Sequence, residues 1–122
     1  MREAILYYHF DSEEKQKLIR ALLPLRVRLR EVPPEEYGMP VGALAGILKE
    51  GKVSAEEEAG VTAPMLVMAG LTGARLDEVL LALRRNGLRI PYKAVLTASN
   101  QTWTGGQLFA ELVQEHQKMS EL

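Results

Sequence analysis

The chain contains no cysteine among its 122 residues. Disulfide bonds, thiolate metal sites and cysteine nucleophiles are therefore excluded. A strong charge of either sign is also missing, because 15 basic and 16 acidic residues leave a formal net charge of −1. This balance gives no electrostatic basis for nucleic acid or an anionic membrane as the main partner.

Long apolar runs are missing as well. Residues 4–10, AILYYHF, are followed at once by charged residues. This run is too short for the core of a signal peptide or for a membrane span. The sequence has no phosphate-binding loop and no G-x-G-x-x-G, and no Ser-His-Asp or His-x-x-x-His arrangement can be assembled. We therefore expect a cytoplasmic protein without a cofactor or a metal.

The hydrophobic pattern alternates between short apolar runs and amphipathic segments. It predicts strands over 4–10, 27–32, 64–70 and 91–98, and helices over 11–24, 41–48, 72–86 and 105–119.

This order predicts an α/β fold with a small, mostly parallel four-stranded sheet, β-α-β-(short α)-β-α-β-α, and helices on both faces. The first and third strands are expected in the centre. A ferredoxin-like α+β sandwich with an extra C-terminal helix is the alternative, because the same strands would be central there. We expect one domain over 1–122 with a mobile acidic loop at about 49–63.

A polar stretch, TASNQTWTGGQ, precedes the last helix. Thr104 and Gln107 have the spacing of a capping box, and Trp103 and Leu108 occupy the positions of a hydrophobic staple. We therefore predict that Trp103 packs on Leu108, and that Thr104 Oγ1 accepts a hydrogen bond from the N–H of residue 106 or 107. In this interpretation the stretch only begins a helix.

A ligand site is the alternative for the same stretch. Ligands of open α/β sheets lie beyond the carboxyl ends of strands, and helix N-termini offer free N–H groups to anions. A lone histidine that follows the first strand lies at such an end. A small anion or polar metabolite would bind among these candidates: His9, Thr72, Gly73, Lys93, Thr97, Asn100, Trp103 and Thr104.

Four segments carry a resemblance to a known family: MLVMAGL, LDEVLLALRRNGL, YKAVLTASNQTW and LFAELVQEH. With them, residues 64–115 resemble a bacterial domain of unknown function, number 3783. The resemblance implies no activity. Its polar motif falls on Lys93, Thr97, Asn100 and Trp103, which makes these residues the first candidates for a functional role.

The layout of residues 64–98 is also similar to the third strand, helix and fourth strand of response-regulator receivers. The chemistry of receivers does not follow. Ala69 or Gly70 stands where their phosphoacceptor aspartate is expected, and His9 and Phe10 stand where their acidic pair is expected. Mg²⁺ would have too few oxygen ligands, so the likeness implies a fold that is not phosphorylated in the usual way.

Three functions are compatible with these patterns. A non-catalytic interaction or regulatory module leads, with an unknown protein or a second copy of the chain (a homodimer) as partner, because edge strands need a cover or a partner. The alternative is a small-ligand sensor. The third is an enzyme, for which His9, Asp11, Lys93 and Asn100 offer the only chemistry. We assign no catalytic residue.

Overall fold

The computed structural model describes residues 2–48 and 60–120 of the chain. It has four strands and four helices in the predicted order: β1 (Ala4–Tyr8), α1 (Ser12–Leu22), β2 (Arg28–Val32), α2 (Val41–Leu44), β3 (Met65–Ala69), α3 (Gly73–Arg85), β4 (Tyr92–Val95) and α4 (Gly105–Ser120). Short 3₁₀ turns, η1 (Leu23–Leu25) and η2 (Pro34–Glu36), flank β2. The predicted acidic loop at 49–63 falls mostly outside the described residues.

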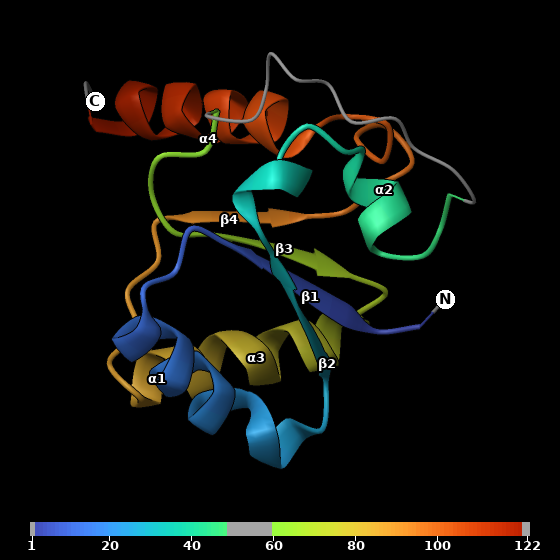
Figure 1. Ribbon diagram of the computed structural model, residues 1–122. Helices are drawn as coiled ribbons and strands as arrows, with labels where there is room; N and C mark the ends of the chain where they lie inside the picture. Colours follow the sequence, from blue (N-terminus) through green and yellow to red (C-terminus); the bar gives the residue numbers. More distant parts are fainter. Residues whose placement is uncertain (1, 49–59, 121–122) are drawn as a thin grey trace.

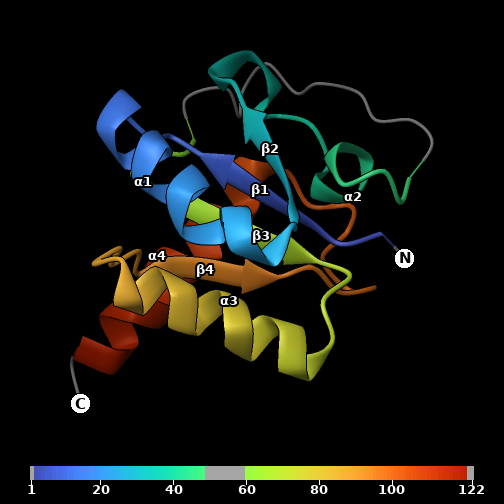
Figure 2. The same cartoon turned by 90° about the horizontal axis from the view of Figure 1, so that it is seen from below.

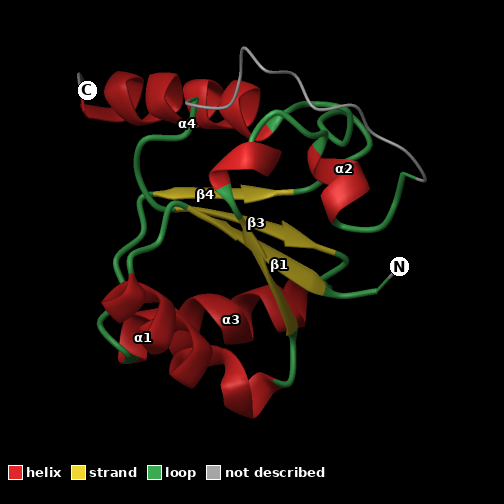
Figure 3. Cartoon of the chain, in the orientation of Figure 1, coloured by secondary structure: helices red, strands yellow, loops and turns green. Residues whose placement is uncertain are grey.

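The four strands form one sheet in the order β2-β1-β3-β4. β1 is parallel to β2 and β3 is parallel to β4, whereas β1 and β3 are antiparallel. The α/β class and the two central strands are therefore confirmed (Figure 3). The ferredoxin-like alternative is wrong, because β1 pairs directly with β2.

The sheet is mixed and mostly parallel, because the pairs β1–β2 and β3–β4 are parallel and the central pair β1–β3 is antiparallel. β4 lies on the side of β3 that points away from β1 and β2. If β3 were parallel to β1, a crossover of the usual hand would put α3 on the face opposite α1. Because β3 is reversed, α1 and α3 share one face, and α2 and α4 cover the other (Figure 1).

The central strands are buried on both faces. Alternate residues of each strand point to different layers: Leu6 and Tyr8 belong to the core under α2 and α4, and Ile5 and Tyr7 to the core under α1 and α3. These two apolar layers hold the edges of the sheet, and therefore any site at an edge, in fixed positions. Within the described residues, no helix is both long enough and apolar enough to cross a membrane.

The chain repeats one unit twice, as β1-α1-β2-α2 and as β3-α3-β4-α4. The antiparallel pairing of β1 with β3 relates the units by an approximate two-fold axis normal to the sheet. Left-handed residues recur at matching places. His9 (φ 62°) and Gly70 (φ 73°) follow the first strand of each unit, and Arg26 (φ 55°) and Gly87 (φ 70°) follow its helical segment.

Candidate functional site

The mixed sheet separates the sequence-predicted site residues. The end of β1 lies beside the start of β3, since Tyr8 is opposite Met65 and Ala4 is opposite Ala69. His9 therefore lies at the end of the sheet where β1 and β2 finish and where β3 and β4 begin. We call this end of the strands the first edge. The segments that follow β3 and β4 leave the sheet at the opposite, second edge. The candidates directly after those strands, Thr72, Gly73, Thr97 and Asn100, are therefore separated from His9. Thr104 lies elsewhere, beside Gly105, whose N–H donates to the carbonyl oxygen of Tyr37.

At the second edge, Thr97 and Asn100 bond to each other. Asn100 Oδ1 accepts the N–H of Thr97 at 2.8 Å, and Thr97 Oγ1 accepts the N–H of Asn100 at 3.3 Å. The Asn100 amide also donates to the carbonyl oxygen of Val95 at 3.1 Å. These polar groups close a turn, and their bonding capacity is directed at the chain itself.

The helix caps account for two more candidates. Thr72 Oγ1 accepts the N–H of Arg75 at the start of α3. Thr104 Oγ1 accepts the N–H of Gln107 at 3.1 Å, and Gln107 Oε1 accepts the N–H of Thr104 at 3.0 Å. The predicted capping box is confirmed, at residue 107. Trp103 packs against the core cluster that contains Leu108.

Lys93 and Gly73 are also placed by the structure. Lys93 is an exposed residue of the edge strand β4, and its Nζ donates to the carbonyl oxygen of Ile90. Gly73 begins α3, and the position that a Cβ would take there is open space. The structure does not assemble the four residues of the enzyme hypothesis into one site. His9 and Asp11 follow β1 at the first edge, Asn100 follows β4 at the second edge, and Lys93 lies within β4.

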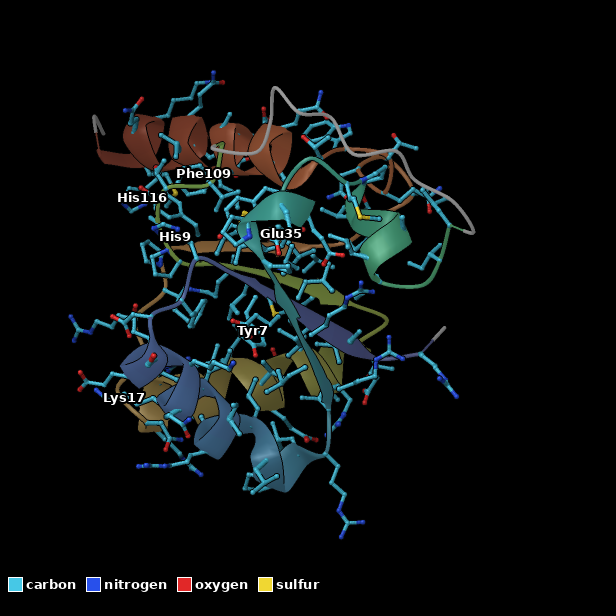
Figure 4. The ribbon with its side chains drawn as sticks, in the orientation of Figure 1. Tyr7, His9, Lys17, Glu35, Phe109 and His116 are labelled. Carbon is cyan, nitrogen blue, oxygen red and sulfur yellow. The ribbon has the colours of Figure 1, made fainter. Side chains whose placement is uncertain are left out.

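The first edge contains a cleft of about 520 Å³ beyond the carboxyl ends of the parallel strands β1 and β2. We call it the His9 cleft, and Figure 4 labels two of its lining residues, Tyr7 and His9. Its walls come from the end of β1, the start of α1, the end of β2, the segment around η2 and the residues before β3. They include Tyr7, His9, Phe10, Asp11, Glu14, Glu31, Pro33, Tyr37 and Thr62.

Two buried tyrosines line this cleft. Burial raises the pKa of the Tyr7 hydroxyl, and the nearby Glu31 carboxylate adds to the effect. Burial also raises the pKa of Tyr37, while a hydrogen bond from the His9 backbone acts in the opposite direction. Both hydroxyls therefore stay protonated at neutral pH and are available as hydrogen-bonding groups.

The charged groups of the cleft are mainly acidic. Asp11, Glu14 and Glu31 contribute carboxylates. Asp11 Oδ1 caps α1 by accepting the N–H of Glu14 at 2.8 Å, and Glu31 pairs with Lys15 at 2.7 Å. The hydrogen bond to Glu31 raises the pKa of Lys15. With aromatic rings beside carboxylates, this chemistry fits a cationic or polar molecule better than an anion.

His9 adopts a left-handed conformation at the rim of the cleft, where its side chain is exposed. Gly70, its counterpart in the second unit, adopts the same conformation without a side chain. The cost to a residue with a Cβ is about 1–2 kcal/mol. Arg26 bears the same cost outside the cleft, so strain alone does not identify a site. The cleft distinguishes His9.

Sequence reasoning found His9 but missed Tyr37 and Glu31. Glu31 lies near the end of β2, and Tyr37 follows the VPPEE segment after η2. The available signal was the parallel pairing of β1 and β2, because the ends of parallel strands meet at one edge. Among the described residues, no group of three or more His, Asp or Glu side chains is arranged to hold a metal ion.

Comparison with known proteins supports the resemblance of the second unit. Residues 64–119 match the sequence model of a family described as domain of unknown function, DUF3783. The matched segment coincides with β3-α3-β4-α4. Neither curated proteins nor solved structures gave a match. The second unit is therefore similar to an uncharacterised domain family.

Proposed function

We propose that the chain is a non-catalytic regulatory module that binds a small polar ligand with a cationic group in the His9 cleft. The observation that carries the proposal is the left-handed histidine at the rim of a 520 Å³ cleft. Ligands of α/β folds bind beyond the carboxyl ends of parallel strands, and this cleft lies at such an end. The proposal keeps the bacterial, cytoplasmic setting expected from sequence.

The walls favour such a ligand for two reasons. Asp11, Glu14 and Glu31 provide carboxylates, of which Asp11 also caps α1 and Glu31 also pairs with Lys15. The rings of Tyr7 and Phe10 meet edge to face with their centroids 5.6 Å apart. An amine or guanidinium group is attracted by both carboxylates and ring faces. The His9 imidazole adds a hydrogen-bonding group that can donate and accept.

The first prediction concerns His9→Gly, with Arg26→Gly as a matched control. Both substitutions relieve a left-handed residue, so each is expected to raise the free energy of unfolding by about 1 kcal/mol. Thermal shift should be measured with arginine, lysine, putrescine and spermidine, and with glutamate and phosphate for comparison. A cationic probe at 100 times its dissociation constant adds about 2.7 kcal/mol of stability.

His9→Gly should lose that shift, and Arg26→Gly should keep it. Retention of the shift in His9→Gly would remove the histidine from the site. A panel in which no cationic probe raises the unfolding temperature of the unaltered chain would reject the proposed function.

A further inference from the structure

We propose that the outer face of α1 and α3 is the contact surface of a homodimer. Figure 2, which views the molecule from below, shows these two helices on the near side of the sheet. A groove of about 330 Å³ runs between the end of α1 and the C-terminal half of α3. Its walls are mainly apolar and include Ala21, Leu25, Glu78, Leu81, Ala82 and Arg85. We call it the α1–α3 groove.

Exposed leucines mark this face as incompletely covered. α3 buries Val79 and Leu83 against the sheet, while Leu81 points away from it and is 40% exposed. Leu23, which directly precedes the groove residues Pro24 and Leu25 in the chain, is 70% exposed. Large apolar side chains beside an apolar groove are typical of a surface that binds a partner.

The charges of the groove indicate that this partner is a second copy of the chain. Glu78 and Arg85 lie on the same outward face of α3, on either side of Leu81 and Ala82. A two-fold axis that passes between Leu81 and Ala82 makes the two α3 helices antiparallel. Glu78 of each copy then faces Arg85 of the other, because a two-fold contact is reciprocal. The patch is therefore self-complementary in charge.

Among the described residues, Arg85 has no acidic partner within its own chain. Glu78 uses one carboxylate oxygen to accept from Arg75 at 3.1 Å, so its second oxygen remains available. With the axis in this position, Leu81 and Ala82 of each copy would pack against the same two residues of the other. The apolar contact supplies affinity, and the charge pairs fix the antiparallel orientation.

The edge strand β4 is a weaker surface for the same partner. β4 has four residues. The next residue in the chain, Leu96, donates its N–H to the carbonyl oxygen of Met68 on β3. Successive residues of a strand direct their backbone groups to opposite sides, so the Val95 carbonyl points outward. The side-chain amide of Asn100 already donates a hydrogen bond to that carbonyl oxygen. An added strand would have to break this bond.

The second prediction tests the groove by sedimentation equilibrium of the full chain over a wide concentration range. The unaltered chain should dimerise, and Leu81→Asp should be monomeric, because it places a charge in the apolar contact. Arg85→Glu should raise the dimer dissociation constant about tenfold, or ~1.4 kcal/mol, because two carboxylates then face each other. The double variant Glu78→Arg/Arg85→Glu should restore dimerisation.

Arg84→Glu is the matched control, since it makes the same charge change one residue away and outside the groove. It should leave the dissociation constant unchanged. Circular dichroism establishes that each variant is folded. A monomeric unaltered chain, an equal effect of Arg84→Glu and Arg85→Glu, or a dimer that survives Leu81→Asp would overturn the inference. The His9 cleft shares no residue with the groove, so the two proposals fail independently.

Discussion

Gly105 is required by the packing of a single aromatic ring. A Cβ at this position would lie 2.5 Å from Cε2 of Tyr8 and 3.2 Å from the carbonyl oxygen of Tyr37. Tyr8 is completely buried in the centre of the sheet, and burial raises the pKa of its hydroxyl. The ring cannot retreat without displacing β1. The first residue of α4 must therefore lack a side chain.

The third prediction compares Gly105→Ala with Gly73→Ala, two substitutions at the first position of a helix. Gly105→Ala should lower the free energy of unfolding by about 1–3 kcal/mol, the usual cost of overpacking. Gly73→Ala should be neutral or should raise it by up to about 1 kcal/mol, because its Cβ enters open space and alanine favours the helix. Urea denaturation measures both. Equal effects would contradict the steric argument.

Single residues were predictable from sequence wherever the signal was local. The predicted cap at Thr104 follows from a polar side chain three residues before an N–H, and it is confirmed. Asp11 and Thr72 cap α1 and α3 at the same spacing. The role of Gly105 was not predictable, because it depends on Tyr8, almost one hundred residues away. Tyr37 was missed in the cleft for the same reason.

At the scale of elements, Arg75 ties three segments together. Its guanidinium bonds both carboxylate oxygens of Glu3 at 2.8 and 3.0 Å, just before β1. It also donates to the carbonyl oxygen of Leu25 at 2.6 Å, in η1. α3 is thus fastened to the entry of the central strand and to the turn before β2. The hydrogen bond from Arg75 lowers the pKa of Glu3.

The fourth prediction follows from that lowered pKa. The pair contributes stability above pH 4.5, the ordinary value for the carboxyl, and the contribution is lost as the pH falls through the lower, folded value. Glu3→Gln should therefore lower the unfolding temperature at pH 7, and the deficit should shrink in acid. Glu111→Gln, on the exposed side of α4, is the control. A deficit that is independent of pH would contradict the ion pair.

Element boundaries were predictable to within a few residues, because caps and breakers are written into the local sequence. The direction of β3 was not. A strand that is apolar on both faces packs equally well in either direction, as residues Met65–Ala69 do. The direction depends on the path between β2 and β3, which carries no local signal. The separation of the predicted site residues follows from that single reversal.

At the scale of the molecule, the two units complete each other. Each provides only two strands, and so small a sheet is marginal alone. They are joined by the β1–β3 pairing and by a bridge between Pro40 and Thr104, where Val41 donates to the carbonyl oxygen of Trp103 at 2.8 Å. Neither unit therefore has a complete core without the other.

The fifth prediction is that both units unfold in one transition. Trp103, the only tryptophan, reports on the second unit, and far-ultraviolet circular dichroism reports on all helices. The two thermal curves should coincide, as expected of a two-state domain. An earlier loss of the Trp103 signal would mean that the units are separate folding bodies.

One residue connects the His9 cleft with the C-terminal helix. Tyr37 contacts the His9 backbone through its hydroxyl, and its carbonyl oxygen accepts the N–H of Gly105 at 3.1 Å. Tyr37 therefore joins the turn at His9 to the first turn of α4. If occupancy of the cleft is communicated, the C-terminal helix is the element that receives it, and amide exchange in that turn is where the signal would be read.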